Sequence, residues 1–125
     1  MALVLCTGVE PTLMATRKLL LEQAGHTVIT ATSERNLAFA CEHYDFDVVV
    51  VGQVMSPQTK LALAAIIRKK CPSAKILELC PLHKGRVLDD ADSWLDVPAD
   101  VPRELAERVS VLAAERKGPK RTDSR

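Results

Sequence analysis

The chain has 125 residues, enough for one domain with a hydrophobic core of its own. It has 47% hydrophobic residues, 26% charged residues and a net charge of +1, which excludes intrinsic disorder for most of the chain. The longest apolar run, residues 61–67, is shorter than the ~20 residues that a membrane-spanning helix needs. No basic region precedes the apolar N-terminus, so we expect a cytoplasmic protein with no membrane contact.

The first half of the chain alternates short apolar runs with helical patterns. Residues 2–6 are apolar and too few for an ordinary helix, which favours a strand. Residues 12–24 carry apolar side chains at helical spacing, and Gly25 follows them, as is common after a helix. Residues 27–31 are rich in β-branched side chains, which predicts a second strand.

The middle of the chain continues this alternation. Ser33 is a suitable N-cap for a helix over residues 34–43. Residues 47–51 contain four consecutive valines, which is typical of a central parallel strand that is covered on both faces. Residues 57–70 have a wide apolar helical face, and Pro72 ends that helix.

The last part predicts two more strands and a final helix. Residues 75–79 form the fourth strand, in which Glu78 interrupts the apolar run that follows Lys75. Residues 81–91 are weakly patterned and contain at most a helical turn. Residues 93–97 form the fifth strand, and residues 101–116 form the last helix.

This order predicts an α/β protein with a doubly wound, five-stranded parallel sheet in the order 2-1-3-4-5 and helices on both faces. The domain is expected to cover residues 1–115. Residues 116–125 carry five basic residues and one acid, which predicts a disordered basic tail. Such a tail can bind nucleic acid weakly, but a solubilising role is more common. The scarcity of aromatic residues (two Phe, one Tyr and one Trp) also argues against nucleic acid.

Several segments have the register of one known family. They are Glu10-Pro11 and Ala24-Gly25 at the ends of the first helix, and residues 44–51, 54–56 and 91–98. Over residues 2–115 the chain therefore resembles response-regulator receiver domains, and this implies a CheY-like fold and a role in two-component or phosphorelay signalling. Cys80 and Trp94 are closer in the chain than in the family, so the fourth helix is expected to be short or missing.

The resemblance also locates the family's phosphorylation pocket. Gly8 and Val9 stand where the family has the acidic pair that holds Mg²⁺, and Gly52 stands at the phosphoacceptor Asp. Cys80 replaces the conserved hydroxyl residue, and Val97 replaces the conserved Lys. Glycine offers no nucleophile and valine no cation, so the resemblance implies a degenerate member that is not phosphorylated.

Other carboxylates do not restore this chemistry. Glu10 offers one carboxylate near the pocket, too few for a Mg²⁺ site without other oxygen ligands. Asp45 and Asp47 lie at the start of the third strand, more than ~13 Å from the pocket, and are expected to face solvent. We therefore expect no bound cofactor or metal and no enzymatic activity.

The function expected from this resemblance is that of a pseudo-receiver that acts through protein contacts, with a signalling partner or as a homodimer. Trp94 falls at the family's switch aromatic. It either anchors a partner or fills the gap left by the short fourth helix, and the sequence leaves both interpretations open.

The alternative is a thiol- or metal-dependent sensor or small enzyme that uses Cys6, Cys80 and His83. Cys6 and Cys80 are expected two strand spacings apart, about 9.5 Å, which is too far for a disulfide. The four cysteines have no C-x-x-C spacing and are expected to be reduced and mostly buried. His26 and His43 are expected to be exposed at helix ends.

Overall fold

The computed structural model describes residues 2–52, 55–81, 85–97 and 101–117, the last range without the side chains of residues 101, 102, 116 and 117. Strands and helices alternate along it until β4, as the sequence predicts. The elements are β1 (Leu3–Thr7), α1 (Pro11–Gln23), β2 (Thr27–Ala31), α2 (Glu34–His43), β3 (Val48–Val51), α3 (Pro57–Lys70), β4 (Lys75–Pro81), β5 (Ser93–Val97) and α4 (Val101–Lys117).

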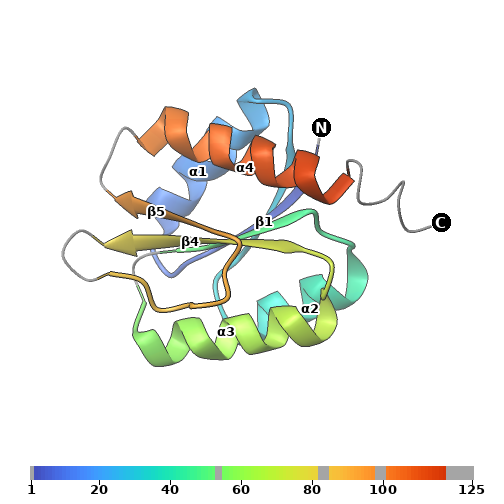
Figure 1. The fold of residues 1–125 in the computed structure, drawn as a ribbon, viewed down its shortest axis with the longest axis vertical. Coiled ribbons are helices and arrows are strands. Elements are labelled where there is room, and N and C mark those ends of the chain that lie inside the picture. The colour runs from blue at the N-terminus through green and yellow to red at the C-terminus, as the bar shows by residue number, and fades with distance from the viewer. Residues whose placement is uncertain (1, 53–54, 82–84, 98–100, 118–125) are drawn as a thin grey trace.

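The five strands form one sheet in the order β2-β1-β3-β4-β5, and every neighbouring pair is parallel. The helices form a layer on each side: α1 and α4 cover one face, and α2 and α3 cover the other (Figure 1). This confirms the predicted doubly wound sheet in the order 2-1-3-4-5. The right-handed preference of parallel crossovers explains why successive helices distribute over both faces.

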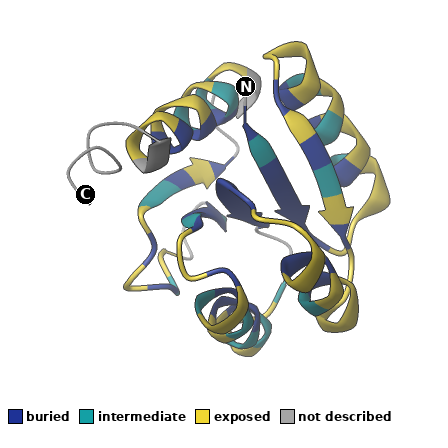
Figure 2. Ribbon diagram, turned by 90° about the vertical axis from the view of Figure 1, so that its right-hand side faces the viewer, coloured by how far each residue is buried: buried dark blue, intermediate teal, exposed yellow. Residues whose placement is uncertain are grey.

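The valine run of β3 lies at the centre of the molecule (Figure 2). Because side chains alternate along a strand, Val48 and Val50 enter the core beneath α1 and α4, whereas Val49 and Val51 enter the core beneath α2 and α3. All four side chains are fully buried. A strand that is covered on both faces has no polar position, which is why the sequence shows an unbroken apolar run.

Side chains at the helix starts explain the helix boundaries. Glu10, Ser33 and Ser56 are the N-caps of α1, α2 and α3, and each accepts hydrogen bonds from backbone amides of the first turn. Ser33 is the cap that the sequence predicts. Gly25 follows α1 with φ of 97°, a left-handed conformation that glycine adopts without strain.

Between β4 and β5 the described residues 85–92 contain no helix, as predicted from the short interval there, and residues 82–84 lie outside the description. At the C-terminus, α4 runs through Lys117, so the first two residues of the predicted tail are helical. The remaining tail residues, 118–125, lie outside the described part, and the domain boundary stays a prediction. No helix among the described residues is long and apolar enough to span a membrane.

Two predictions of solvent exposure were wrong. Asp47 is buried, and its carboxylate accepts a hydrogen bond of 2.8 Å from the amide of Leu3, which ties the start of β3 to β1. His26 is also buried, and its Nε2 lies 3.1 Å from the hydroxyl oxygen of Ser110 on α4. Asp45 and His43 are exposed, as predicted.

The burial of His26 predicts a pH-dependent stability. Burial lowers the pKa of His26 below its ordinary value of 6.5. As the pH falls, the unfolded chain therefore takes up this proton before the folded chain does. The free energy of unfolding should be highest above about pH 6.5 and should fall as the pH decreases from there to the lowered pKa of the folded state.

Urea unfolding between pH 8 and pH 5 measures this effect. His26→Gln should flatten part of the decline, because glutamine has no proton to gain and keeps a polar group near Ser110. His43→Gln, at an exposed position, is the matched control and should decline like the unmodified protein. Equal slopes for His26→Gln and the unmodified chain would contradict the prediction.

Candidate functional site

The carboxyl ends of β1 and β3 bring the predicted pocket residues together. Thr7 and Val51 are register partners at the ends of these strands, so Gly8 and Gly52 follow side by side. A Cβ atom placed on Gly52 would lie 3.5 Å from the Cα atom of Gly8. A shallow hollow here is lined by Gly8, Val9, Glu10 and Gly52 from the predicted set, and by Leu13, Met14 and Arg17 of α1.

Gly52 is closed in by backbone. A Cβ atom at this position would lie 2.7 Å from the carbonyl oxygen of Thr7, closer than such contacts occur in proteins. A Cβ on Gly8 would meet the sulfur of Met14 at 2.8 Å, but that sulfur is at the flexible end of a side chain. The two glycines therefore differ: a side chain at position 52 requires a backbone shift, and one at position 8 requires only a new Met14 rotamer.

Arg17 is the pocket residue that the sequence analysis missed. It lies on α1 with only 5% of its surface exposed, and one guanidinium nitrogen is 3.5 Å from the place where a Cβ of Gly52 would be. Burial lowers the pKa of its guanidinium from the ordinary value, but an arginine stays charged in proteins. Its spacing from Met14 and Leu21 places it on the buried face of α1, and this is the signal in the sequence that could have revealed it.

Glu10 and Val9 lie at the rim of the hollow. One carboxylate oxygen of Glu10 accepts hydrogen bonds of 2.9 Å from the amide of Thr12 and 3.1 Å from that of Leu13. This carboxylate therefore caps α1 and neutralises the positive end of the helix dipole. Val9 is exposed and contributes no polar atom.

The other two predicted pocket residues lie apart from this hollow. Cys80 pairs in register with Asp96 and Pro81 with Val97, and the side chains of Cys80 and Val97 are buried in the core. Among the described residues, neither contributes to the lining around Gly52. The resemblance therefore locates Gly8, Val9, Glu10 and Gly52 in one place, and it locates Cys80 and Val97 one strand and two strands farther along the edge.

Cys6 and Cys80 do not form a thiol site. Cys6 is level with Val50, and Val50 is level with Leu77, three residues before Cys80. Two strand spacings and three residues along the strand separate their Cα atoms by about 14 Å, more than predicted. Burial raises the pKa of Cys6 to about 12 and also raises that of Cys80, so neither thiol is activated at neutral pH.

The third member of that alternative, His83, lies outside the described residues. Within the described part of the chain, no three histidine, cysteine or acidic side chains are arranged to hold a metal ion.

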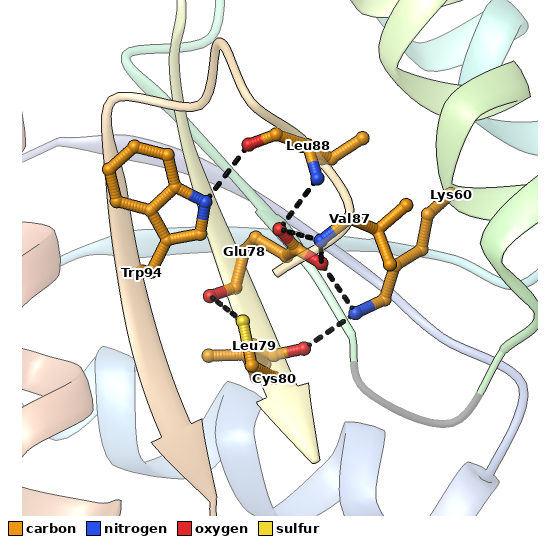
Figure 3. A network of polar contacts seen from close by, with 7 residues as sticks. All are labelled: Lys60, Glu78, Leu79, Cys80, Val87, Leu88 and Trp94. Carbon is orange, nitrogen blue, oxygen red and sulfur yellow. Dashed lines mark hydrogen bonds and ion pairs between the residues drawn. The ribbon is translucent and has the colours of Figure 1, made fainter. Parts of the chain in front are cut away.

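A buried ion pair lies beside Cys80 (Figure 3). Lys60 of α3 and Glu78 of β4 are 1% and 0% exposed in their side chains, and Nζ lies 2.8 Å from Oε2. The ammonium also donates a hydrogen bond of 2.9 Å to the carbonyl oxygen of Leu79. Lys60 shares a helix face with Leu63, Ala64 and Ile67, and that spacing indicates its burial in the sequence.

The same carboxylate holds the segment that stands in place of a fourth helix. Glu78 accepts hydrogen bonds from the amide of Val87 at 3.0 and 3.1 Å and from the amide of Leu88 at 2.9 Å. The indole Nε1 of Trp94 donates to the carbonyl oxygen of Leu88 at 2.9 Å (Figure 3). Glu78 and Trp94 are register partners on β4 and β5, so both fasten residues 85–92 from the sheet.

Trp94 is half-buried, and the guanidinium carbon of Arg86 lies 4.2 Å from the centre of its ring. Its ring packs against the core beneath α2 and α3. Of the two interpretations that the sequence leaves open, this packing and the Leu88 hydrogen bond agree with the filling of the space of a missing helix. Part of the ring and the cation of Arg86 remain at the surface.

Comparison with known proteins gives matches in structure alone. No family model matches the sequence, and no curated protein is similar to it. The receiver domain of the Francisella response regulator 1452 has a TM-score of 0.79 at 22% identity, over 92% of this chain and 98% of that one. Response regulator TrrA from Thermotoga maritima, in complex with Mg²⁺ and BeF, has a TM-score of 0.74 at 26% identity, over 90% and 99%.

This chain has the response-regulator receiver fold. A structure titled adenylate cyclase, from Rhodopirellula baltica, also matches, with a TM-score of 0.85 at 15% identity over 98% of this chain and 95% of that one. At such identities the matches establish the CheY-like architecture, and the residues at the sheet edge must carry any argument about chemistry.

The Lys60–Glu78 pair predicts a strong coupling in stability. Lys60→Met leaves a buried carboxylate without its cation, and Glu78→Gln leaves a buried ammonium without its counter-ion. Each single change should lower the free energy of unfolding by about 3–5 kcal/mol, and the double variant should lose less than the sum of the two.

Urea unfolding of the four proteins, treated as a double-mutant cycle, measures this coupling. The exposed pair Lys18–Glu22, 3.1 Å apart on α1, is the matched control. Lys18→Met and Glu22→Gln should each change the free energy of unfolding by less than about 1 kcal/mol. Strict additivity at Lys60 and Glu78 would disprove the coupling.

Proposed function

We propose that this chain is a pseudo-receiver: a receiver-fold module of two-component signalling that does not accept a phosphoryl group and acts through protein contacts. The observation that supports this most directly is the enclosure of Gly52. The position of the family's phosphoacceptor has no side chain, and the carbonyl oxygen of Thr7 lies where a side chain would begin. Without a nucleophile at this position, phosphoryl transfer to the sheet edge has no acceptor.

The residues around Gly52 also do not fit a Mg²⁺ ion. Magnesium requires a near-octahedral set of oxygen ligands, usually with one or two carboxylates. Gly8, Val9 and Gly52 have no side-chain oxygen, and the carboxylate of Glu10 caps α1. The buried guanidinium of Arg17 adds a positive charge at the same place and repels a second cation.

Arg17 gives the pocket a fixed arrangement. Its guanidinium lies against Gly52, in space that a side chain at position 52 would approach. In such a pocket the positive charge belongs to a side chain and does not exchange. No ion or phosphoryl group enters or leaves, so no change of charge is available to switch the conformation. In this proposal, regulation comes from partner binding, which shifts populations without phosphorylation.

The partner of such a module is a signalling protein or a second copy of the chain. The surface where residues 85–92 replace a helix differs from that of an ordinary receiver. There Arg86 and the half-buried Trp94 combine a cation with an aromatic ring, and both residue types are common at the centres of interfaces. The thiol or metal alternative through Cys6 and Cys80 has no comparable support, because the two thiols are buried and far apart.

The test is phosphorylation by a small-molecule donor. With Mg²⁺ and acetyl phosphate, the intact mass of the protein should not change, and Mg²⁺ should not shift the amide NMR signals of Gly8, Glu10 or Gly52. Gly52→Asp should also remain unmodified, because the Thr7 carbonyl and Arg17 occupy the surroundings of the new side chain. A phosphate adduct on the unmodified chain would refute the proposal.

A stability comparison separates steric closure from simple loss of the nucleophile. Gly52→Ala should lower the free energy of unfolding by about 1–3 kcal/mol, because the backbone near Thr7 must move. Gly8→Ala is the matched control and should cost less, because Met14 can adopt another rotamer. Equal losses in the two variants, measured by urea unfolding, would show that the Gly52 site is open.

A further inference from the structure

The second pair of cysteines lies at the end of the molecule opposite the pocket. Helices α2 and α3 run side by side on one face of the sheet (Figure 1). Cys41 lies in the last turn of α2, and Cys71 is the C-cap residue of α3. Next to them, Glu42 and Lys70 join the same two helix ends through an ion pair of 2.6 Å.

The two cysteines are in contact. The sulfur of Cys71 lies 3.5 Å from the carbonyl oxygen of Cys41 and 3.9 Å from that of Tyr44. The chain positions of these cysteines are 30 residues apart, so only the packing of α2 against α3 brings them together.

The surroundings of this pair differ from those of the other two cysteines. Cys41 and Cys71 are 4% and 5% exposed, whereas Cys6 and Cys80 are fully buried in separate parts of the core. Exposed residues follow each member of the pair in the chain: Glu42 after Cys41, and Pro72 after Cys71. A small opening of the helix ends therefore exposes this pair first.

We propose that Cys41 and Cys71 are a redox-active dithiol, which a peroxide converts into an intramolecular disulfide between the ends of α2 and α3. Both are free thiols in the structure. Because the Cys71 sulfur already contacts the backbone of Cys41, a local movement of the two helix ends brings the sulfurs to the ~2.05 Å of an S–S bond. The bond would close the chain between residues 41 and 71 around β3 and α3.

The reaction balances in two steps. The Cys71 thiolate attacks one oxygen of hydrogen peroxide, and the O–O bond breaks. The departing hydroxide takes up the proton that the thiol released, so a sulfenic acid and one water form. The Cys41 sulfur then attacks the sulfenic sulfur, the S–O bond breaks, and a second water leaves with the remaining proton. The two sulfurs lose two electrons in total, and peroxide gains them.

The order of attack follows from the protonation of Cys41. Burial, and after it the neighbouring Cys71 thiol, raises the pKa of Cys41 to about 12. Its thiolate is therefore scarce at neutral pH, so Cys41 is a poor first nucleophile and takes the second step. Because thiolate is the reactive form, the oxidation should be faster at pH 8.5 than at pH 6.5.

The experiment treats the native, reduced protein with a few equivalents of hydrogen peroxide. We expect a loss of about 2 Da in intact mass, the mass of two hydrogen atoms, and its reversal by dithiothreitol. Trypsin leaves each cysteine on a different peptide, with Cys41 on residues 36–60 and Cys71 on residues 71–75. Under non-reducing conditions these two peptides should appear as one linked species.

Variants and a denatured control make the result decisive. Cys41→Ser and Cys71→Ser should each abolish the 2 Da loss, whereas a Cys6→Ser, Cys80→Ser double variant should keep it. The peptide map of the unmodified protein decides the matter even if a variant fails to fold. Three results would overturn the proposal. One is a bridge that contains Cys6 or Cys80, and another is sulfinic acid without a bridge. The third is a native protein that keeps four intact thiols under conditions that oxidise the urea-unfolded chain.

Discussion

The buried contact between Lys60 and Glu78 is the interaction on which one edge of this domain depends. A charge in a protein interior is costly unless a counter-ion and hydrogen-bond donors satisfy it. Glu78 has both, since the Lys60 ammonium and the amides of Val87 and Leu88 surround its carboxylate. One side chain of β4 thereby fixes α3 on one side and residues 85–92 on the other. Residues 85–92 contain no helix. The amides of Val87 and Leu88 therefore have no helical carbonyl as acceptor, and the carboxylate of Glu78 on β4 accepts their hydrogen bonds.

The neighbouring strand β3 has a different arrangement just beyond Val51, the register partner of Glu78. At Gly52 the backbone of Thr7 approaches so closely that no Cβ fits, and the buried Arg17 lies next to this position. A receiver-type pocket needs oxygen ligands, a nucleophile and an exchangeable cation in one place. Here glycine, a capping glutamate and an internal guanidinium stand in those places. The receiver fold is retained, and the pseudo-receiver function that we propose rests on these residues at its edge.

The sequence predicted more of the fold than of the site, and particular residues show why. The four valines of β3 and the helical spacing around them predicted the strand order, because each pattern reports directly on which faces are covered. The position of Gly52 followed from the register of the resemblance. Asp47 and His26 were predicted to face solvent and are buried, because their partners, Leu3 and Ser110, are distant in the chain. The spacing of Arg17 and Lys60 on apolar helix faces indicated that both are buried. It did not indicate which groups they contact, because those groups lie on other elements of the fold.

The sequence by itself determined the parallel α/β architecture, the absence of a side chain at position 52 and the short interval between β4 and β5. These properties depend on periodicity and on the presence or absence of a chemical group, which a linear sequence records. Only the tertiary structure decided that Gly52 is sterically closed, that Arg17 lies beside it, that Lys60 pairs with Glu78, and that Cys41 contacts Cys71 rather than Cys6 approaching Cys80. Each of these is a contact between elements far apart in the chain. Such contacts are set by how the helices pack against the sheet to within an ångström, and hydrophobic patterning does not specify packing at that precision.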